Sequence, residues 1–153
     1  MGRILIVEDD NNKRGQLQQL IRDQFPETEM VIARSLQSGI RALRNEELRL
    51  VILDMTLPNF DQGPDESGGS THAFGGREFL GQMERFSISV PVIVVTQFES
   101  FGIGSEAMTL EQLDRQLRTD YGSVYQGKVY YHAAIQGWKQ ELSELMKRIV
   151  ANN

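Results

Sequence analysis

The stretch ILIVEDD, residues 4–10, places four apolar residues directly before three acids. An apolar run without polar alternation predicts a strand that is buried on both faces, as in a parallel sheet. The run LVIL at 50–53 repeats this pattern and ends at Asp54, and VIVV at 92–95 repeats it again and ends at Thr96. The chain therefore holds three expected buried strands, each of which stops at a polar residue.

Helical patterns of apolar residues separate these runs, and two weaker runs at 30–33 and 129–133 complete a set of five expected strands. The expected helical stripes consist of Leu17, Leu20, Ile21 and Phe25; Leu36, Ile40 and Leu43; Phe79, Leu80, Met83 and Phe86; Leu110, Leu113, Leu117 and Tyr121; and Trp138, Leu142, Leu145 and Ile149. Ser35 is suited to cap the second helix, and Thr109 with Gln112 the fourth. Alternating strands and helices predict an α/β fold, a flavodoxin-like (βα)5 doubly wound parallel sheet with strand order 2-1-3-4-5.

One domain over residues 1–153 is expected from the length. Two connections are longer than a minimal version of this fold needs, at about 58–76 and at 97–108. The first is rich in Gly, Asp and Ser. Loops of such length without secondary structure of their own are functional or mobile.

Composition excludes several classes of protein. The chain has no cysteine and only two histidines, which argues against a disulfide scaffold, a thiolate metal site or a multi-histidine zinc site. The net charge of -5 disfavours nucleic acid or an anionic membrane as the main partner. No apolar run approaches the roughly 20 residues that span a bilayer. Acids directly after the first apolar run argue against a signal peptide, so a cytoplasmic protein is expected.

In a doubly wound sheet, ligands bind beyond the carboxyl ends of the strands, where the strand order reverses. With the expected order, Glu8, Asp9 and Asp10 end one strand at that point and Asp54 ends its neighbour. Such carboxylates would repel one another and raise one another's pKa. A hard divalent cation would remove that cost, and Mg²⁺ suits a site of carboxylates, waters and phosphate oxygens.

ILIVEDD, LVILDMTLP and PVIVVT, in this order and spacing, resemble the CheY-like receiver domain of bacterial two-component response regulators. The resemblance implies that Asp54 is the phosphoacceptor and that Thr96 is the hydroxyl that engages the phosphoryl group. It implies that Glu8, Asp9 and Asp54 hold Mg²⁺, with the backbone carbonyl of Thr56 as a further ligand. A carboxylate can form an acyl phosphate, and positioning with cationic neutralisation would drive that transfer.

The chain departs from this family at the end of the fifth expected strand. Family members usually carry a lysine followed by a proline there, and the lysine contacts the phosphoryl group. Residues 131–135 contain neither. Lys128 is expected at the start of that strand, at the wrong end for this role. The two expanded loops fall on the face where partners dock, so the acceptor site resembles the family while the signalling apparatus is altered.

Residues near the expected site also have simpler interpretations. Asp10 is expected to be an exposed neighbour or a helix-start residue and not a ligand. Tyr130 and Tyr131 should point to opposite faces, and the sequence does not decide which of them takes the part of the family's rotating aromatic. His132 is expected on the strand surface and His72 in a solvated loop. Trp138 is expected in the core, and the Gly-rich loop lacks a phosphate-cradle pattern.

The leading expectation is a single-domain response regulator that is phosphorylated on Asp54 by a histidine kinase or a phosphotransfer protein. It would signal through protein contacts, without direct nucleic-acid or membrane binding, and the family's pairing habit is compatible with a homodimer. The alternative is a pseudo-receiver docking module that does not depend on phosphorylation. A third interpretation, a haloacid dehalogenase-type phosphatase, is prompted by the run 53–56. Thr56 stands where that family has its second aspartate, so turnover would be poor.

Overall fold

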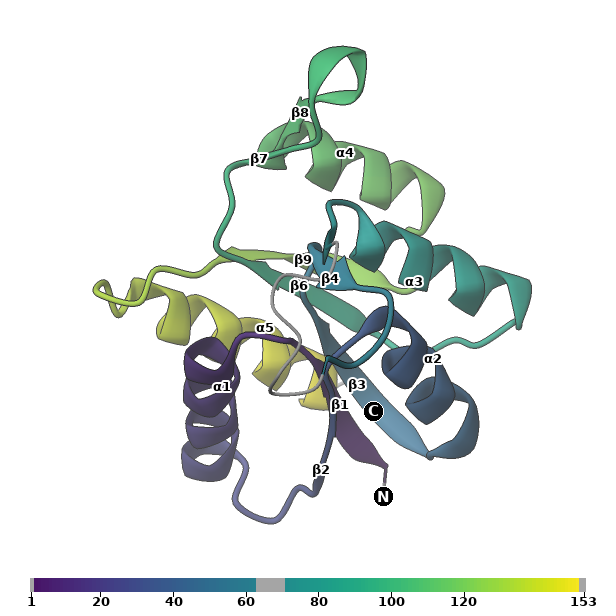
Figure 1. Ribbon diagram of the computed structural model, residues 1–153. Coiled ribbons are helices and arrows are strands. Elements are labelled where there is room, and N and C mark those ends of the chain that lie inside the picture. Colours follow the sequence, from purple (N-terminus) through teal and green to yellow (C-terminus); the bar gives the residue numbers. More distant parts are fainter. Residues whose placement is uncertain (1, 63–70, 152–153) are drawn as a thin grey trace.

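The computed structural model describes residues 2–62 and 71–151, and a parallel five-stranded sheet lies at its centre (Figure 1). The strands follow the spatial order β2-β1-β3-β6-β9. Their bounds are Arg3–Val7 for β1, Met30–Ala33 for β2, Leu48–Leu53 for β3, Val92–Thr96 for β6 and Tyr125–Tyr130 for β9. Counted in chain order, this is the predicted order 2-1-3-4-5, so the predicted fold class is confirmed.

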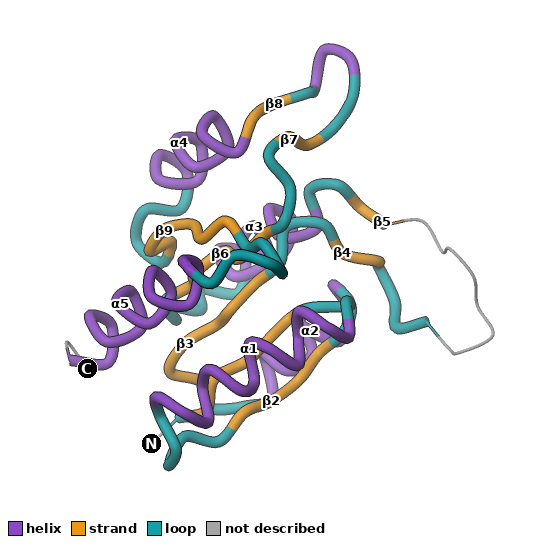
Figure 2. Tube along the Cα trace, turned by 90° about the vertical axis from the view of Figure 1, so that its left-hand side faces the viewer, coloured by secondary structure: helices purple, strands orange, loops and turns teal. Residues whose placement is uncertain are grey.

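Helices cover both faces of the sheet (Figures 1 and 2). The helices α1 (Asn11–Gln24) and α5 (Gly137–Ala151) pack on one face. The other face is covered by α2 (Leu36–Asn45), α3 (Gly75–Arg85) and α4 (Leu110–Asp120). Successive residues of a strand point to opposite faces, so a buried strand must be apolar throughout.

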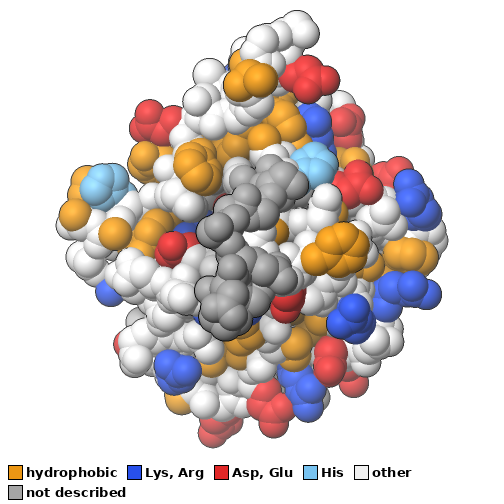
Figure 3. Space-filling model, in the orientation of Figure 1, with side chains coloured by type: hydrophobic (Ala, Val, Ile, Leu, Met, Phe, Trp, Pro, Cys, Tyr) orange, Lys and Arg blue, Asp and Glu red, His pale blue; other side chains and the backbone are white. Residues whose placement is uncertain are grey.

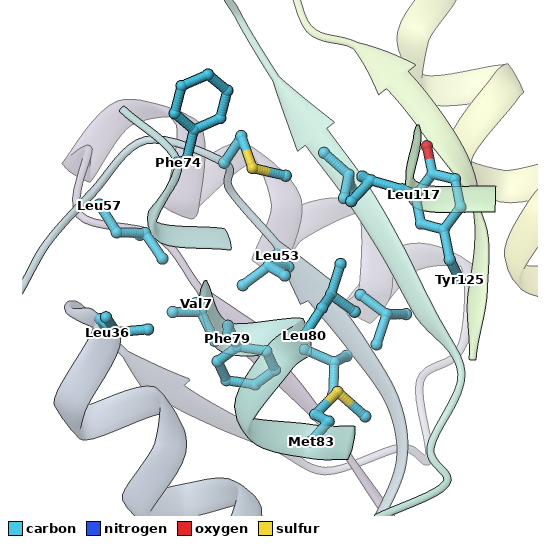
Figure 4. Close-up of a cluster of buried hydrophobic side chains, with 14 of the residues drawn as sticks. Val7, Leu36, Leu53, Leu57, Phe74, Phe79, Leu80, Met83, Leu117 and Tyr125 are labelled. Carbon is cyan, nitrogen blue, oxygen red and sulfur yellow. The ribbon is translucent and has the colours of Figure 1, made fainter. Parts of the chain in front are cut away.

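The core on the α2–α4 side shows how the predicted stripes pack (Figure 4). Val7 and Leu53 point from β1 and β3 toward Phe79, Leu80 and Met83 of α3, and all five are buried. Full burial of a side chain of this size contributes roughly 1.5–3 kcal/mol. This packing holds α3 against the strands whose ends carry Glu8 and Asp54.

Both predicted helix caps are present. The side chain of Ser35 accepts a hydrogen bond from the Ser38 backbone, and that of Thr109 accepts one from the Gln112 backbone, each within a reciprocal capping box. Such caps satisfy backbone donors that a helix start otherwise leaves unpaired.

Two local predictions were wrong. The last strand was expected at 129–133, but β9 spans Tyr125–Tyr130 and Lys128 lies within it, not at its start. Because β9 is an edge strand, its residues alternate between buried and partly exposed, and it lacks the continuous apolar run that marks the central strands. Phe86 was expected on the buried stripe of the third helix, yet it ends α3 and lies under the guanidinium of Arg44.

The two long connections carry short antiparallel pairs, so the expectation of loops without structure is corrected. Strand β4 (Leu57–Pro58) pairs with β5 (Thr71–His72), and residues 63–70 of the predicted 58–76 loop lie outside the described residues. In the second connection, β7 (Ser100–Phe101) pairs with β8 (Met108–Thr109), which ends one residue beyond the predicted 97–108, and a 3-10 turn lies between them. This second pair stands beside the start of α4 (Figure 2). None of the helices described is long and apolar enough to cross a membrane.

Candidate acidic site at the sheet edge

Three polar side chains lie where β1, β3 and β6 end. Glu8 follows β1, Asp54 follows β3 and Thr96 is the last residue of β6. The strands are parallel, so their carboxyl ends share one edge of the sheet, and the Asp54 amide still donates to the Val7 carbonyl at 3.0 Å. Glu8, Asp54 and Thr96 are each at most 2% exposed.

The structure brings three of the predicted acids together. One carboxylate oxygen each from Glu8, Asp9 and Asp54 lies within 4.8 Å of the others. Asp9 is half-buried. Thr56 is also half-buried, and its hydroxyl donates to the Ala73 carbonyl at 3.4 Å. Its role as a carbonyl ligand stays a prediction.

Burial and mutual repulsion dominate the electrostatics of this cluster. Loss of water around Glu8, together with the charge of Asp54, raises the pKa of the Glu8 carboxyl to about 9. The same two causes, in the same order, raise the pKa of Asp9. The raised pKa values show that burial and neighbouring negative charge disfavour the ionised form of these carboxyls.

A lysine that the sequence analysis did not select lies inside this cluster. Lys13 of α1 is 1% exposed, and its Nζ lies 3.1 Å from Glu8 Oε2 and 3.3 Å from Asp54 Oδ1. It also donates to the Val95 carbonyl at 2.7 Å and to Gln97 Oε1 at 2.8 Å. A lysine is almost never this buried without such partners.

The start of α1 places this lysine. Asp10 is the N-cap, and its side chain accepts a hydrogen bond from the Lys13 amide at 2.7 Å, so Asp10 is the exposed helix-start residue that was expected. Lys13 then precedes Leu17 and Leu20 on the buried stripe at helical spacing. The sequence signal that could have indicated Lys13 is its helical spacing to the apolar residues of this stripe.

The donor set fits Mg²⁺. With all three carboxylates ionised, as a bound cation would favour, the acids and the one ammonium would carry two net negative charges, which a divalent cation would balance. Glu8 Oε2 and Asp54 Oδ1 are buried and, despite their ion contacts with Lys13, accept no hydrogen bond of acceptable geometry from the residues described. Buried oxygens in this state have lone pairs that are free for a cation.

The remaining predicted residues have clear positions. Thr96 Oγ1 accepts a hydrogen bond from the Phe98 amide at 3.2 Å. Tyr131 is buried against Trp138, with ring centroids 4.9 Å apart, whereas Tyr130 is exposed. Trp138 is thus a core residue, as expected.

The basic groups of the last strand do not reach the cluster. His132 is exposed just beyond β9, where its Nδ1 accepts from the Ala134 amide, and Lys128 Nζ pairs with Glu111 at 3.2 Å. His72 is exposed as well.

Comparison with known sequences gives relatives that span nearly the whole chain, although no family model matches it. The uncharacterized protein y4jR of Sinorhizobium fredii is 40% identical over 140 residues, which cover 90% of this chain and 91% of that protein. The Detocs response regulatory protein DtcB of Enterobacter cloacae is 29% identical over 142 residues, 92% of this chain and 95% of that one.

Comparison with solved structures gives receiver domains. A CheY-like receiver domain protein of Methanospirillum hungatei has a TM-score of 0.64 at 18% identity and covers 99% of this chain and 95% of its own. The response regulator TrrA of Thermotoga maritima, solved in complex with Mg²⁺-BeF, has a TM-score of 0.59 at 19% identity, with 95% and 99% covered. At these identities the comparison establishes the shared fold.

Proposed function

The chain belongs to the same family as y4jR and is a CheY-like receiver domain, and from this premise we propose that it accepts a phosphoryl group on Asp54 and signals in a two-component pathway. The observation that carries the proposal is the state of the Asp54 side chain. It is buried at the carboxyl edge of the sheet beside Glu8 and Asp9, and its Oδ1 accepts no hydrogen bond from the residues described.

The chemistry is the formation of an acyl phosphate. A carboxylate oxygen of Asp54 attacks the phosphorus of the donor, and the bond from phosphorus to the leaving group breaks, with the electron pair departing on that group. The leaving group would be a histidine imidazole of a kinase or phosphotransfer protein, or acetate when acetyl phosphate is the donor. Thr96, at the end of the neighbouring strand β6, would donate a hydrogen bond to a phosphoryl oxygen.

The acidic residues would hold the metal ion. Glu8, Asp9 and Asp54 would bind Mg²⁺, with the Thr56 carbonyl as a further ligand, and the ion would supply positive charge to the transferring phosphoryl group. The TrrA relative was solved with Mg²⁺-BeF, which supports the same ion here. Burial and the charge of Asp54 raise the pKa of Glu8 and Asp9, and such an ion would favour the ionised carboxylates that serve as its ligands.

The partners would be proteins. We place the exchange in the cytoplasm, with a histidine kinase or phosphotransfer protein as donor and a second protein as receiver of the signal. The face of the molecule in Figure 3 mixes acidic, basic and apolar side chains instead of gathering charge of one sign. That mixture is typical of surfaces that contact proteins and unlike a nucleic-acid site.

A pseudo-receiver is the second candidate function, and Lys13 is the observation that favours it. Its ammonium already lies between Glu8 and Asp54 and partly neutralises them. A module of this kind would keep the fold and the acidic cluster but would dock its partner without phosphorylation.

Phosphorylation of the purified chain separates the two functions. We expect acetyl phosphate with Mg²⁺ to add the mass of one phosphoryl group, as measured on the intact protein, and we expect Asp54→Asn to remove the adduct. Asp114→Asn is the control, because that carboxylate lies on α4, away from the cluster, and should leave phosphorylation unchanged. A folded wild-type chain that gains no mass would favour the pseudo-receiver.

A further inference from the structure

We propose that Lys13 is the cationic residue that contacts the phosphoryl group on Asp54, so that α1 supplies the charge that receiver domains otherwise take from the last strand. The inference rests on the proposed function, because it assigns a residue to the same reaction. It starts from the position of one ammonium group. Nζ of Lys13 lies 3.3 Å from Asp54 Oδ1 and 3.1 Å from Glu8 Oε2.

The other basic groups near the last strand are engaged elsewhere. Lys128 pairs with Glu111 on α4, and His132 is exposed with its Nδ1 bonded to the backbone. Among the residues described, Lys13 is the basic side chain that forms an ion pair with Asp54. The geometry therefore offers one direct source of side-chain charge at the acceptor.

The contacts of Lys13 would allow its ammonium to move from a carboxylate oxygen to a phosphoryl oxygen. Its hydrogen bonds go to the Val95 carbonyl and to Gln97 Oε1, which fix the ammonium from the side of β6. Its contacts with Glu8 Oε2 and Asp54 Oδ1 are close in distance but lack hydrogen-bond geometry. A small shift of the ammonium toward a phosphoryl oxygen would exchange a poorly aligned ion contact for a charge-assisted hydrogen bond.

The charge balance favours that shift. Phosphorylation replaces the single negative charge of Asp54 with the ≈ −1.5 to −2 of a phosphoryl group. Lys13 forms and breaks no covalent bond in this step. It would stabilise the charge that spreads over the phosphoryl oxygens during transfer, and a buried site makes such stabilisation stronger than water would allow.

The first test is the rate of phosphorylation by acetyl phosphate and Mg²⁺. We expect Lys13→Gln to slow the gain of one phosphoryl mass by roughly 100-fold, the loss that follows removal of one preorganised donor. Lys13→Arg, which keeps the charge, should recover part of the rate. Lys128→Gln is the matched control and should react as the wild type does, because its ammonium pairs with Glu111.

The second test separates a charge effect from a structural one. Removing the ammonium takes a positive charge from beside Glu8 and Asp54, so Lys13→Gln should bind Mg²⁺ at least about tenfold more tightly while it phosphorylates more slowly. Mg²⁺ affinity is read from the single tryptophan, Trp138, which packs on Tyr131. A residue needed only for folding would weaken both properties together.

The outcomes are distinct. A folded Lys13→Gln chain that phosphorylates at the wild-type rate, or that loses Mg²⁺ affinity in step with phosphorylation, overturns the role of Lys13 and leaves Asp54 as acceptor. A wild-type chain that takes no phosphoryl group overturns the proposed function and this inference with it. If Lys13→Gln does not fold, Lys13→Met with Mg²⁺ present replaces it, since Met keeps much of the aliphatic length.

Discussion

At the scale of the residue, the acidic site depends on how a buried lysine is held. Taking an ammonium group out of water costs several kcal/mol, which its carboxylate and carbonyl partners must offset. Lys13 meets this cost with two ion contacts and two hydrogen bonds. The Asp10 cap fixes the first turn of α1 and therefore the position from which that side chain reaches inward.

Asp10→Ala tests this dependence. Loss of the N-cap should lower the free energy of unfolding by about 1 kcal/mol. It should also slow phosphorylation of Asp54, because the first turn that carries Lys13 loosens. Chemical denaturation and the acetyl phosphate reaction measure the two effects. Asp23→Ala, near the other end of α1, is the control, and an equal loss of stability there would contradict the assignment of the cap.

The residues of the site differ in how far the sequence revealed them. Glu8 and Asp54 directly follow apolar runs and Asp9 comes next after Glu8, so the parallel sheet alone predicts that they meet. Lys13 reaches the same place because it lies four residues before Leu17, on the buried face of α1. That spacing alone does not predict burial, because the charged group of a lysine on an apolar stripe normally stays in water. The family pattern places a basic residue at the last strand, whereas the ammonium beside Asp54 belongs to α1.

At the scale of the element, α3 approaches the backbone around Asp54 closely. Gly76 donates its amide to the Met55 carbonyl at 2.8 Å. A Cβ at this position would lie 2.7 Å from the Asp54 carbonyl oxygen and 2.9 Å from the Met55 Cα. Only a residue without a side chain lets the helix start here, so this glycine sets the distance between α3 and the backbone at Asp54.

Gly76→Ala should therefore lower the free energy of unfolding by roughly 1–3 kcal/mol, the usual cost of overpacking. Gly81→Ala is the matched control on the same helix, since its Cβ would meet nothing closer than the Tyr121 hydroxyl at 3.5 Å. It should raise stability by roughly 0.5–1 kcal/mol, because alanine favours a helix over glycine. Urea denaturation of both variants measures the contrast, and a stabilising Gly76→Ala would contradict the close approach.

The start of α2 gives a prediction on pH. Asp61 accepts hydrogen bonds from Ser35 and Ser38, the latter at 2.7 Å. Although partial burial acts in the opposite direction, these hydrogen bonds hold the pKa of the Asp61 carboxyl below its ordinary value of 3.8. The stabilisation is present above that ordinary value and is lost as the pH falls through the lowered pKa.

Asp61→Asn should therefore reduce the loss of stability between neutral pH and strong acid, as followed by thermal unfolding at a series of pH values. Asp120→Asn, at the end of α4, serves as the comparison. An unchanged acid profile in Asp61→Asn would show that these hydrogen bonds do not favour the ionised carboxyl.

The elements also show where sequence patterns were sufficient. Continuous apolar runs located β1, β3 and β6, because these strands lie between neighbours and under helices on both sides. The edge strand β9 has no partner strand on one side, and its residues alternate between buried and partly exposed. Its predicted bounds were therefore wrong. The pairs β4–β5 and β7–β8 have only two residues a strand, too short for any periodic signal.

At the scale of the whole molecule, the proposed metal site would link ion binding to folding. A cation that binds the folded acidic cluster and not the unfolded chain stabilises the fold by mass action, by about 2.7 kcal/mol at a concentration of 100 times Kd. Mg²⁺ should therefore raise the thermal midpoint of the wild type. Asp9→Asn should reduce this gain, and calorimetry measures both. The same rise in Asp9→Asn as in the wild type would place the ion elsewhere.

We expect the carboxyl edge of the sheet, with Asp54 at its centre, to work as a phosphoryl site. Fluorine NMR of the chain with beryllofluoride, which stands in for a phosphoryl group on a carboxylate, tests it most directly. We predict bound-fluoride signals that appear only when Mg²⁺ is present and that vanish in Asp54→Asn. Signals that persist in Asp54→Asn, or a folded wild-type chain that shows none with Mg²⁺, would contradict the claim.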